Sequence, residues 1–100
     1  MQQQPDHPPT HMMDARRRRI LFRATHRGTY ENDILVGNFV RARVAAFSLE
    51  ELDALEAVMD HTDVLLADWL TGRQSIPDEH DCPMLRAMLA AAEAGEGRPE

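Results

Sequence analysis

The sequence is poor in several residue types: its 100 residues include one cysteine and no lysine, and only 5% of them are aromatic. Because Cys82 has no second cysteine to pair with, an internal disulfide is excluded, and a reducing compartment such as the cytoplasm is expected. No apolar run approaches the length of a membrane span, and the start lacks the apolar segment of a secretory signal. We therefore expect a cytoplasmic protein without a membrane partner.

The low aromatic content leaves Leu, Ile, Val, Met and Ala to fill a modest core, since 43% of the chain is hydrophobic. Apolar and polar residues seldom alternate as they would in a strand, whereas Ala, Leu, Glu and Arg, which favour helices, are abundant. The pattern predicts an all-α fold, and the length supports one small domain.

Both ends of the chain have compositions typical of disorder. Residues 1–12 are rich in glutamine and proline and have nothing to bury, and residues 96–100 follow the last helix signal. We expect a folded domain over residues 13–95, flanked by two disordered tails.

Five helices are predicted within this domain from capping residues, glycines and apolar spacing. They are expected over about residues 14–27, 30–43, 48–60, 62–72 and 83–95. Asp14 can cap the first helix, and Ser48 with Glu51 forms a capping box at the start of the third. The second helix is apolar on several sides, so we expect a five-helix bundle in which the others pack around it.

The charges are unevenly distributed along a chain whose net charge is −6. Residues 1–47 contain eight arginines and four acidic residues, whereas residues 48–100 contain three arginines and thirteen acidic residues. The four consecutive arginines at residues 16–19 are compatible with a nucleic-acid-binding or antitoxin-like regulator. They are also compatible with a solvated helix face whose arginine stems cover apolar neighbours. We favour the second interpretation and expect no nucleic acid, because the acidic half would repel DNA.

Residues suited to catalysis are few. Glu31 and Asp33 lie two positions apart in a predicted helix and diverge, so they cannot act as an acid and a base on one face. Cys82 has no evident activating base, and residues 80–82 (His-Asp-Cys) lack a second ligand pair at the spacing of a zinc site. We expect neither an enzyme nor a metal site.

The corner between the first two predicted helices holds the most informative polar groups. Gly28 can adopt the left-handed conformation that ends a helix, and Arg27 lies at the negative end of that helix. Thr29 can cap the next helix, with Glu31 and Asp33 in its first turn. Arg27 and Glu31 are therefore expected to face each other across the corner. Helix capping alone would account for all of these residues, and partner binding is the alternative.

Four segments resemble the FAD assembly factors of succinate dehydrogenase, a family of small five-helix proteins marked by the motif Arg-Gly-x-x-Glu. Residues 27–31 read Arg-Gly-Thr-Tyr-Glu, and residues 32–39 resemble the segment that follows the motif in that family. Residues 48–52 and 68–72 match the start of its third helix and the end of its fourth. Because the four segments occur in the right order over about residues 14–90, the resemblance is more specific than any one of them.

The resemblance implies a chain that binds the flavoprotein subunit of succinate dehydrogenase, and in some cases of fumarate reductase, and promotes covalent attachment of FAD to it. FAD is then carried by the partner, so no cofactor should be bound stably by this chain, which we expect to be a monomer. The motif makes Arg27, Gly28 and Glu31 partner-binding residues: the side chains of Arg27 and Glu31 are expected to face outward, and Gly28 keeps the corner low enough for close approach. Tyr30 and Asp33 are further candidates. A helical interaction module whose partner is unrelated to flavin is a third interpretation.

Overall fold

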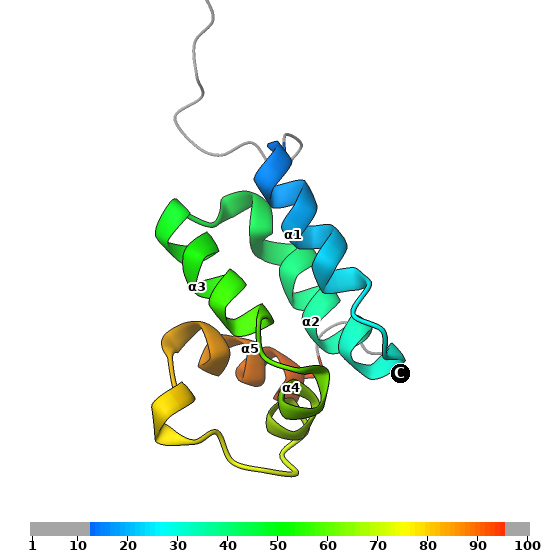
Figure 1. The fold of residues 1–100 in the computed structure, drawn as a ribbon, viewed down its shortest axis with the longest axis vertical. Coiled ribbons are helices and arrows are strands. Elements are labelled where there is room, and N and C mark those ends of the chain that lie inside the picture. The colour runs from blue at the N-terminus through cyan, green and yellow to red at the C-terminus, as the bar shows by residue number, and fades with distance from the viewer. Residues whose placement is uncertain (1–12, 96–100) are drawn as a thin grey trace, which may run out of the picture.

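The computed structural model describes residues 13–95, which contain five α-helices, two short 3-10 helices and no strand (Figure 1). The α-helices are α1 (Ala15–Thr25), α2 (Tyr30–Arg43), α3 (Leu49–Met59), α4 (Asp63–Leu70) and α5 (Pro83–Glu93). The 3-10 helices are η1 (Val44–Ala46) and η2 (Asp78–His80). The all-α prediction with five helices is confirmed, and the two predicted tails lie outside the described residues.

Four of the helices begin at a side chain that caps the first turn. Asp14, Thr29 and Thr62 accept from backbone N–H groups of α1, α2 and α4, and Ser48 forms a reciprocal capping box with Glu51. These caps follow from local sequence, which is why the predicted starts are confirmed.

The ends of α1, α4 and α5 each lie two residues before the predicted ones, and the early end of α1 matters most for the corner. The helix stops at Thr25, two residues before the expected end at Arg27, and the backbone N–H of His26 donates to the carbonyl of Arg23 at 3.4 Å. The Thr25 hydroxyl donates to the Leu21 carbonyl at 2.9 Å, which occupies an acceptor of the last turn. The early stop releases Arg27 from the helix, so its side chain can turn toward another part of the fold.

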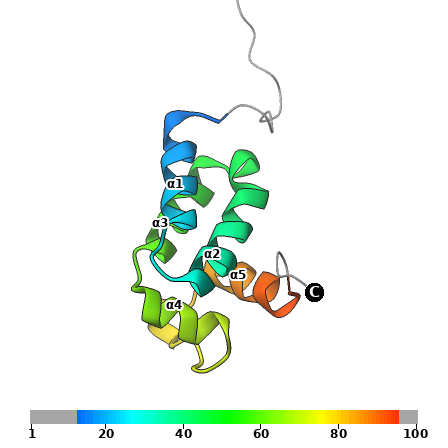
Figure 2. The ribbon, with the colours of Figure 1, turned by 90° about the vertical axis from the view of Figure 1, so that its right-hand side faces the viewer.

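The central element is α2, which lies beside α1 and contacts α4 and α5 (Figures 1 and 2). It lies close to α1 at Gly37, where a Cβ atom would lie 3.1 Å from Cγ2 of Thr25 and 3.2 Å from the carbonyl oxygen of Ala24. A Cβ atom there would be in tighter than ordinary contact with the end of α1, which would have to shift by a few tenths of an ångström, so the close packing favours a glycine in mid-helix.

Apolar side chains from all five α-helices form one core. Its largest fully buried members are Trp69, Phe39, Ile20, Leu52, Leu55, Met59, Leu66, Leu85 and Met88. Trp69 is only 2% exposed and is the largest side chain of this core. Among the described residues, no helix combines the length and the hydropathy that crossing a bilayer would require.

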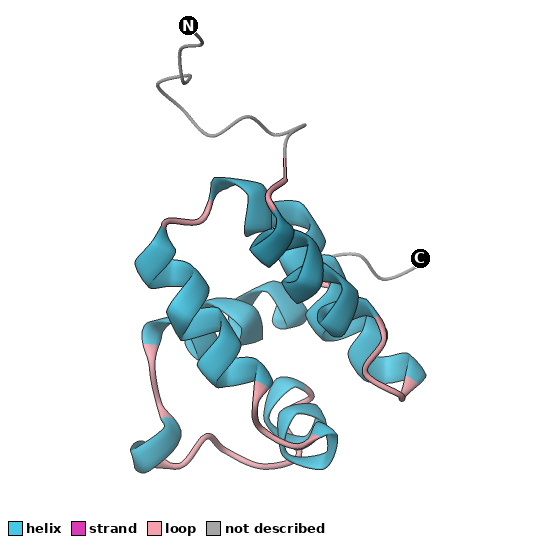
Figure 3. Cartoon of the chain, turned by 45° about the horizontal axis from the view of Figure 1, so that its top comes forward, coloured by secondary structure: helices cyan, strands magenta, loops and turns pink. Residues whose placement is uncertain are grey.

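The connection from α4 to α5 is the longest loop within the described residues, and η2 interrupts it (Figure 3). The shorter connections, from α1 to α2 and from α3 to α4, meet near the start of α4. The candidate site is built where they meet.

Candidate functional site

The corner between α1 and α2 turns at Gly28, whose φ is +105°. This left-handed conformation is unfavourable for a residue with a Cβ atom, so the conformation predicted for Gly28 is confirmed. Its predicted role in ending the first helix is wrong, because α1 already ends at Thr25 with His26 as its cap, and Gly28 instead turns the chain between the two helices. A Cβ atom built on Gly28 would lie 4.0 Å from Oδ2 of Asp63 at the start of α4. The corner therefore lies directly against α4.

The Arg27 side chain fastens this corner to the connection between α3 and α4. Its Nε donates to Oδ1 of Asp63 at 2.7 Å, and its Nη1 and Nη2 donate to the carbonyls of Met59 and His61 at 2.7 and 2.9 Å. Only 9% of the side chain is exposed. The Met59 carbonyl is at the last residue of α3, where a helix leaves acceptors unpaired and favours a cation, and the His61 carbonyl lies just beyond that end.

Two residues of the first turn of α2 complete the polar network. Oδ1 of Asp33 accepts from the backbone N–H of Arg27 at 2.7 Å. The amide nitrogen of Asn32 donates to the Asp63 carbonyl at 2.8 Å and to its carboxylate at 3.3 Å. Asn32 is fully buried, and its Oδ1 has no hydrogen-bond partner in the described part of the chain. We call Arg27, Asn32, Asp33 and Asp63 the corner network.

Glu31 points away from the corner network and is 44% exposed. Its carboxylate lies 3.5 Å from Nη2 of Arg73, and Arg73 also donates to Asp68 at 2.9 Å. The hydrogen bond with Asp68, and after it the charge of Glu31, raise the pKa of Arg73 above its ordinary value. Glu31 thus belongs to an exposed, solvent-screened cluster of charges.

The expectation that Arg27 and Glu31 face each other across the corner is wrong, and so is the expectation that the Arg27 side chain faces outward. The guanidinium reaches acceptors more than thirty residues away in sequence, which capping rules cannot anticipate. Glu31 does face outward, as expected. Whether any of these residues contacts a partner stays a prediction.

Tyr30, at the first position of α2, is 78% exposed and is the most exposed large hydrophobic side chain of the described residues. The equivalent position of α3 holds Leu49, which is 65% exposed, and each is followed by an exposed glutamate, Glu31 or Glu50. The chain therefore contains two helix starts of similar design, of which only the first lies at the corner.

A small aromatic cluster lies next to the corner network. The ring of His61 contacts Trp69 edge-on at a centroid distance of 5.0 Å and lies 4.8 Å from the ring of His80. Partial burial, and after it the proximity of His80, lower the pKa of His61 below its usual 6.5, although the charge of Asp60 acts in the opposite direction. The His61 carbonyl is also an acceptor for Arg27, so the cluster and the network share one residue.

The arginine run of α1 makes contacts within the domain. Arg16 donates to Asp53 and Glu56 of α3 at 2.6 and 2.7 Å. Arg17 donates to the carbonyls of Val44 and Phe47 at 3.0 and 2.6 Å. Arg16 and Arg17 thus bond within the domain and are less solvated than the favoured interpretation of the run expected, at 29% and 16% exposed. These contacts leave less charge for a nucleic-acid backbone.

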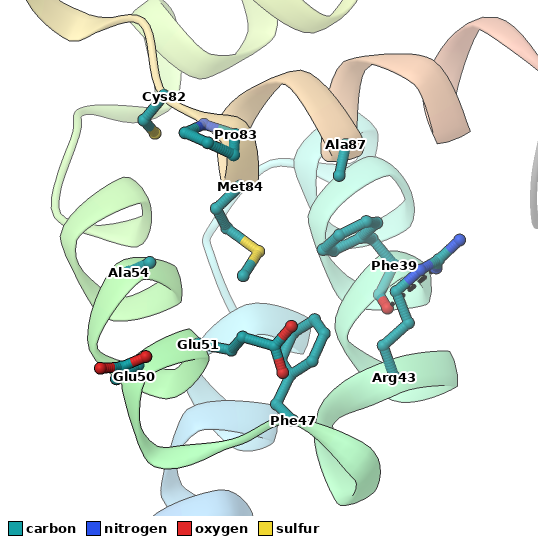
Figure 4. A pocket seen from close by; sticks show the side chains of 10 residues that line it. All are labelled: Phe39, Arg43, Phe47, Glu50, Glu51, Ala54, Cys82, Pro83, Met84 and Ala87. Atoms are coloured by element: carbon teal, nitrogen blue, oxygen red, sulfur yellow. Dashed lines mark hydrogen bonds between the residues drawn. The ribbon is translucent and has the colours of Figure 1, made fainter.

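A separate hollow of about 380 Å³ lies between the second half of α2 and the starts of α3 and α5 (Figure 4). Its floor is apolar, with Phe39, Phe47 and Met84, and Glu50 and Glu51 lie along one side. None of the residues predicted for the partner site lines it. Within residues 13–95, no group of three or more His, Cys, Asp and Glu side chains is arranged to hold a metal ion.

Three residues of the site were missed by reasoning from the sequence: Asn32, Asp63 and Arg73. Asn32 carried a usable signal, because it lies on the same helical face as Val36 and Phe39, where a polar residue needs a buried partner. Asp63 resembles an ordinary first-turn acid, and Arg73 an ordinary loop cation, so neither carried a local signal.

Comparison with known proteins agrees with the resemblance noted in the sequence. A protein-family model described as "Flavinator of succinate dehydrogenase" matches residues 18–92. The chain is 51% identical over 75 residues to a protein of Acetobacter pasteurianus named "FAD assembly factor SdhE"; the match covers 75% of this chain and 69% of that protein.

More distant relatives are mitochondrial. The chain is 33% identical over 73 residues to "Succinate dehydrogenase assembly factor 2" of Caenorhabditis briggsae, covering 71% of this chain and 60% of the relative. It is 26% identical over 97 residues to "Succinate dehydrogenase assembly factor 2-A" of Drosophila yakuba, covering 93% and 60%. The chain thus matches less than two thirds of the length of these two relatives. No solved structure is significantly similar to it.

Proposed function

The chain belongs to the family of flavinators of succinate dehydrogenase, and on that premise we propose that it binds the flavoprotein subunit and promotes covalent attachment of FAD to it. The contact residues are those of the corner motif: Tyr30 and Glu31 through their side chains, and Gly28 through its backbone. Arg27 and Asp33 support the same surface from within.

The chain acts as a binding partner and not as a catalyst of its own. The reactive flavin and the residue to which it becomes attached belong to the flavoprotein, which carries the FAD. A factor without an active site can still promote attachment if it binds more tightly to the flavoprotein conformation in which flavin and acceptor are in register. It then shifts the population toward that conformation and needs no stably bound cofactor.

The observation that carries the proposal is the geometry of the motif. A glutamate and a tyrosine stand exposed at the start of α2, while the arginine of the same motif fixes that start against α4. A rigid frame that presents exposed groups loses little conformational freedom when a partner binds. Action as a monomer in the cytoplasm is part of the proposal, and the single cysteine suits that compartment.

The test uses the two similar helix starts. Purified flavoprotein without covalent flavin is incubated with FAD and this chain, and the flavin that remains on the denatured flavoprotein is measured over time. We expect Glu31→Gln to slow attachment about tenfold at limiting chain, which is what losing one charge-assisted hydrogen bond across an interface would cause.

The matched control is Glu50→Gln, because Glu50 occupies the same position of α3. We expect this variant to support attachment at the wild-type rate. The proposal would be abandoned if the wild-type chain neither bound the flavoprotein nor accelerated attachment, and Glu31 would lose its role if both glutamine variants behaved alike.

A further inference from the structure

Asp63, at the start of α4, lies outside the Arg-Gly-x-x-Glu motif but forms an ion pair with the arginine of that motif. Asp63 accepts from Nε of Arg27 at 2.7 Å through its carboxylate. The same residue accepts from the Asn32 amide through both its carbonyl and its carboxylate. One residue of α4 therefore contacts both the end of the corner and the first turn of α2.

We infer that Asp63 is a positioning residue for partner binding, which sets the orientation of the exposed start of α2 by holding Arg27 and Asn32. This inference rests on the proposed function and adds a residue to its site. Asp63 itself does not touch the partner; it acts through the corner network.

The hydrogen bonds connect Asp63 to the first turn of α2 through Arg27. Arg27 uses all three of its side-chain nitrogens within the domain, so its guanidinium plane is fixed by Asp63 on one side and by two carbonyls on the other. The backbone N–H of Arg27 donates to Asp33, which carries the constraint into the first turn of α2, two residues after Glu31. A substitution at Asp63 would thus change the orientation of Glu31 and Tyr30 through this chain of contacts.

The corner network stabilises the junction between α2 and α4 less efficiently than apolar packing would. The Arg27 side chain is almost buried, and the buried Oδ1 of Asn32 has no hydrogen-bond partner in the described region. An unsatisfied buried acceptor is unfavourable, and apolar packing usually holds such a junction at least as well as an ion pair. Directional bonds instead select one arrangement of the corner, which is the property that a presented binding surface needs.

The test is the affinity of the chain for the flavoprotein, measured at a temperature at which every variant is folded. Asp63→Asn keeps the size of the side chain but removes its charge. If it lowers the share of chains with a binding-competent corner to about a tenth, the apparent Kd rises about tenfold. Rates of covalent flavin attachment at limiting chain should fall in parallel.

A control that destabilises the fold away from the corner separates positioning from general loss of folding. Leu52→Val removes one methylene group from a fully buried core position in the first half of α3, at a cost of about 1 kcal/mol. We expect it to lower the melting temperature while leaving the Kd unchanged.

A double variant tests whether Asp63 acts through Arg27. If it does, Asp63→Asn combined with Arg27→Gln should weaken binding by clearly less than the sum of the two single effects, the remainder being the loss of the Asn32 link. Wild-type affinity in Asp63→Asn, full additivity with Arg27→Gln, or an equal loss in Leu52→Val would each overturn the inference while the proposed function stands. Failure of the wild-type chain to bind the flavoprotein would overturn both.

Discussion

The starts of α2 and α3 use the same local chemistry but are connected to the rest of the fold in different ways. Each has a hydroxyl cap, an exposed apolar first residue and a glutamate at the second position. At α3 the cap is closed locally by Ser48 and Glu51, at 3.1 and 2.8 Å. At α2 the neighbouring residues are bonded to α4 and to the loop after it, through Asp63 and Arg73.

The comparison shows that capping a helix and fixing its orientation are separate tasks, carried out by different contacts. A capping box satisfies backbone groups within one turn, and it places no constraint on the neighbouring elements. Long-range hydrogen bonds fix one element against another and are therefore suited to a surface that must keep its shape. The following three predictions test this contrast, in order of decreasing effect.

Arg27→Ala should have the largest effect on the free energy of unfolding. It leaves the partly buried carbonyls of Met59 and His61 without their donor and Asp63 without its cation, at a cost of about 2–4 kcal/mol. Urea unfolding checks this value. Ser48→Ala, which opens the local cap of α3, should cost only about 1 kcal/mol. Equal costs for the two variants would remove the contrast between the helix starts.

Gly28→Ala should have an intermediate effect, because an alanine must adopt a φ of +105° or move the corner away from α4. A left-handed residue with a Cβ atom costs about 1–2 kcal/mol. Gly72→Ala, at a φ of +82°, provides a second glycine of this kind for comparison by thermal unfolding. If Gly28→Ala were as stable as the wild type, the left-handed turn would be unnecessary for the corner.

Acidification should produce the smallest effect, through His61. Its pKa in the folded state is lowered from 6.5, so between the two values the unfolded chain binds more protons. Stability is thus highest above about pH 6.5 and declines as the pH falls through the lowered pKa of the folded state. Unfolding free energies between about pH 7.5 and pH 5 should show this decline.

The variant His61→Gln should flatten that dependence. His80, Trp69 and the charge of Asp60 surround the ring, and the Arg27 guanidinium is bonded to the backbone of the same residue. Asp14 and Asp81 also have lowered pKa values, but from 3.8, so they contribute only at more acidic pH. An unchanged pH profile in His61→Gln would assign the decline to another group.

Sequence reasoning worked where the physics is local. The caps at Asp14, Thr29 and Ser48 depend on contacts within one turn, and a glycine such as Gly28 is required by its own φ. The helix count and the central place of α2 likewise follow from apolar spacing.

Reasoning from the sequence failed for the direction of Arg27. Two helices that meet at a corner can present an arginine to solvent or to a third element, and the choice depends on where α4 lies. That position is set by packing of the whole core, so neither the inward turn of Arg27 nor the role of Asp63 had a local cause. The exposure of Glu31, in contrast, follows from its place on the polar side of α2.

The burial of Trp69 gives the protein a built-in optical probe. It is the only tryptophan in the chain, and its indole lies against His61, whose carbonyl is bonded to Arg27. Its emission therefore reports on the neighbourhood of the corner without an added dye. A substitution or a bound flavoprotein could loosen the junction between α2 and α4. The intensity or the wavelength of the Trp69 fluorescence should then change.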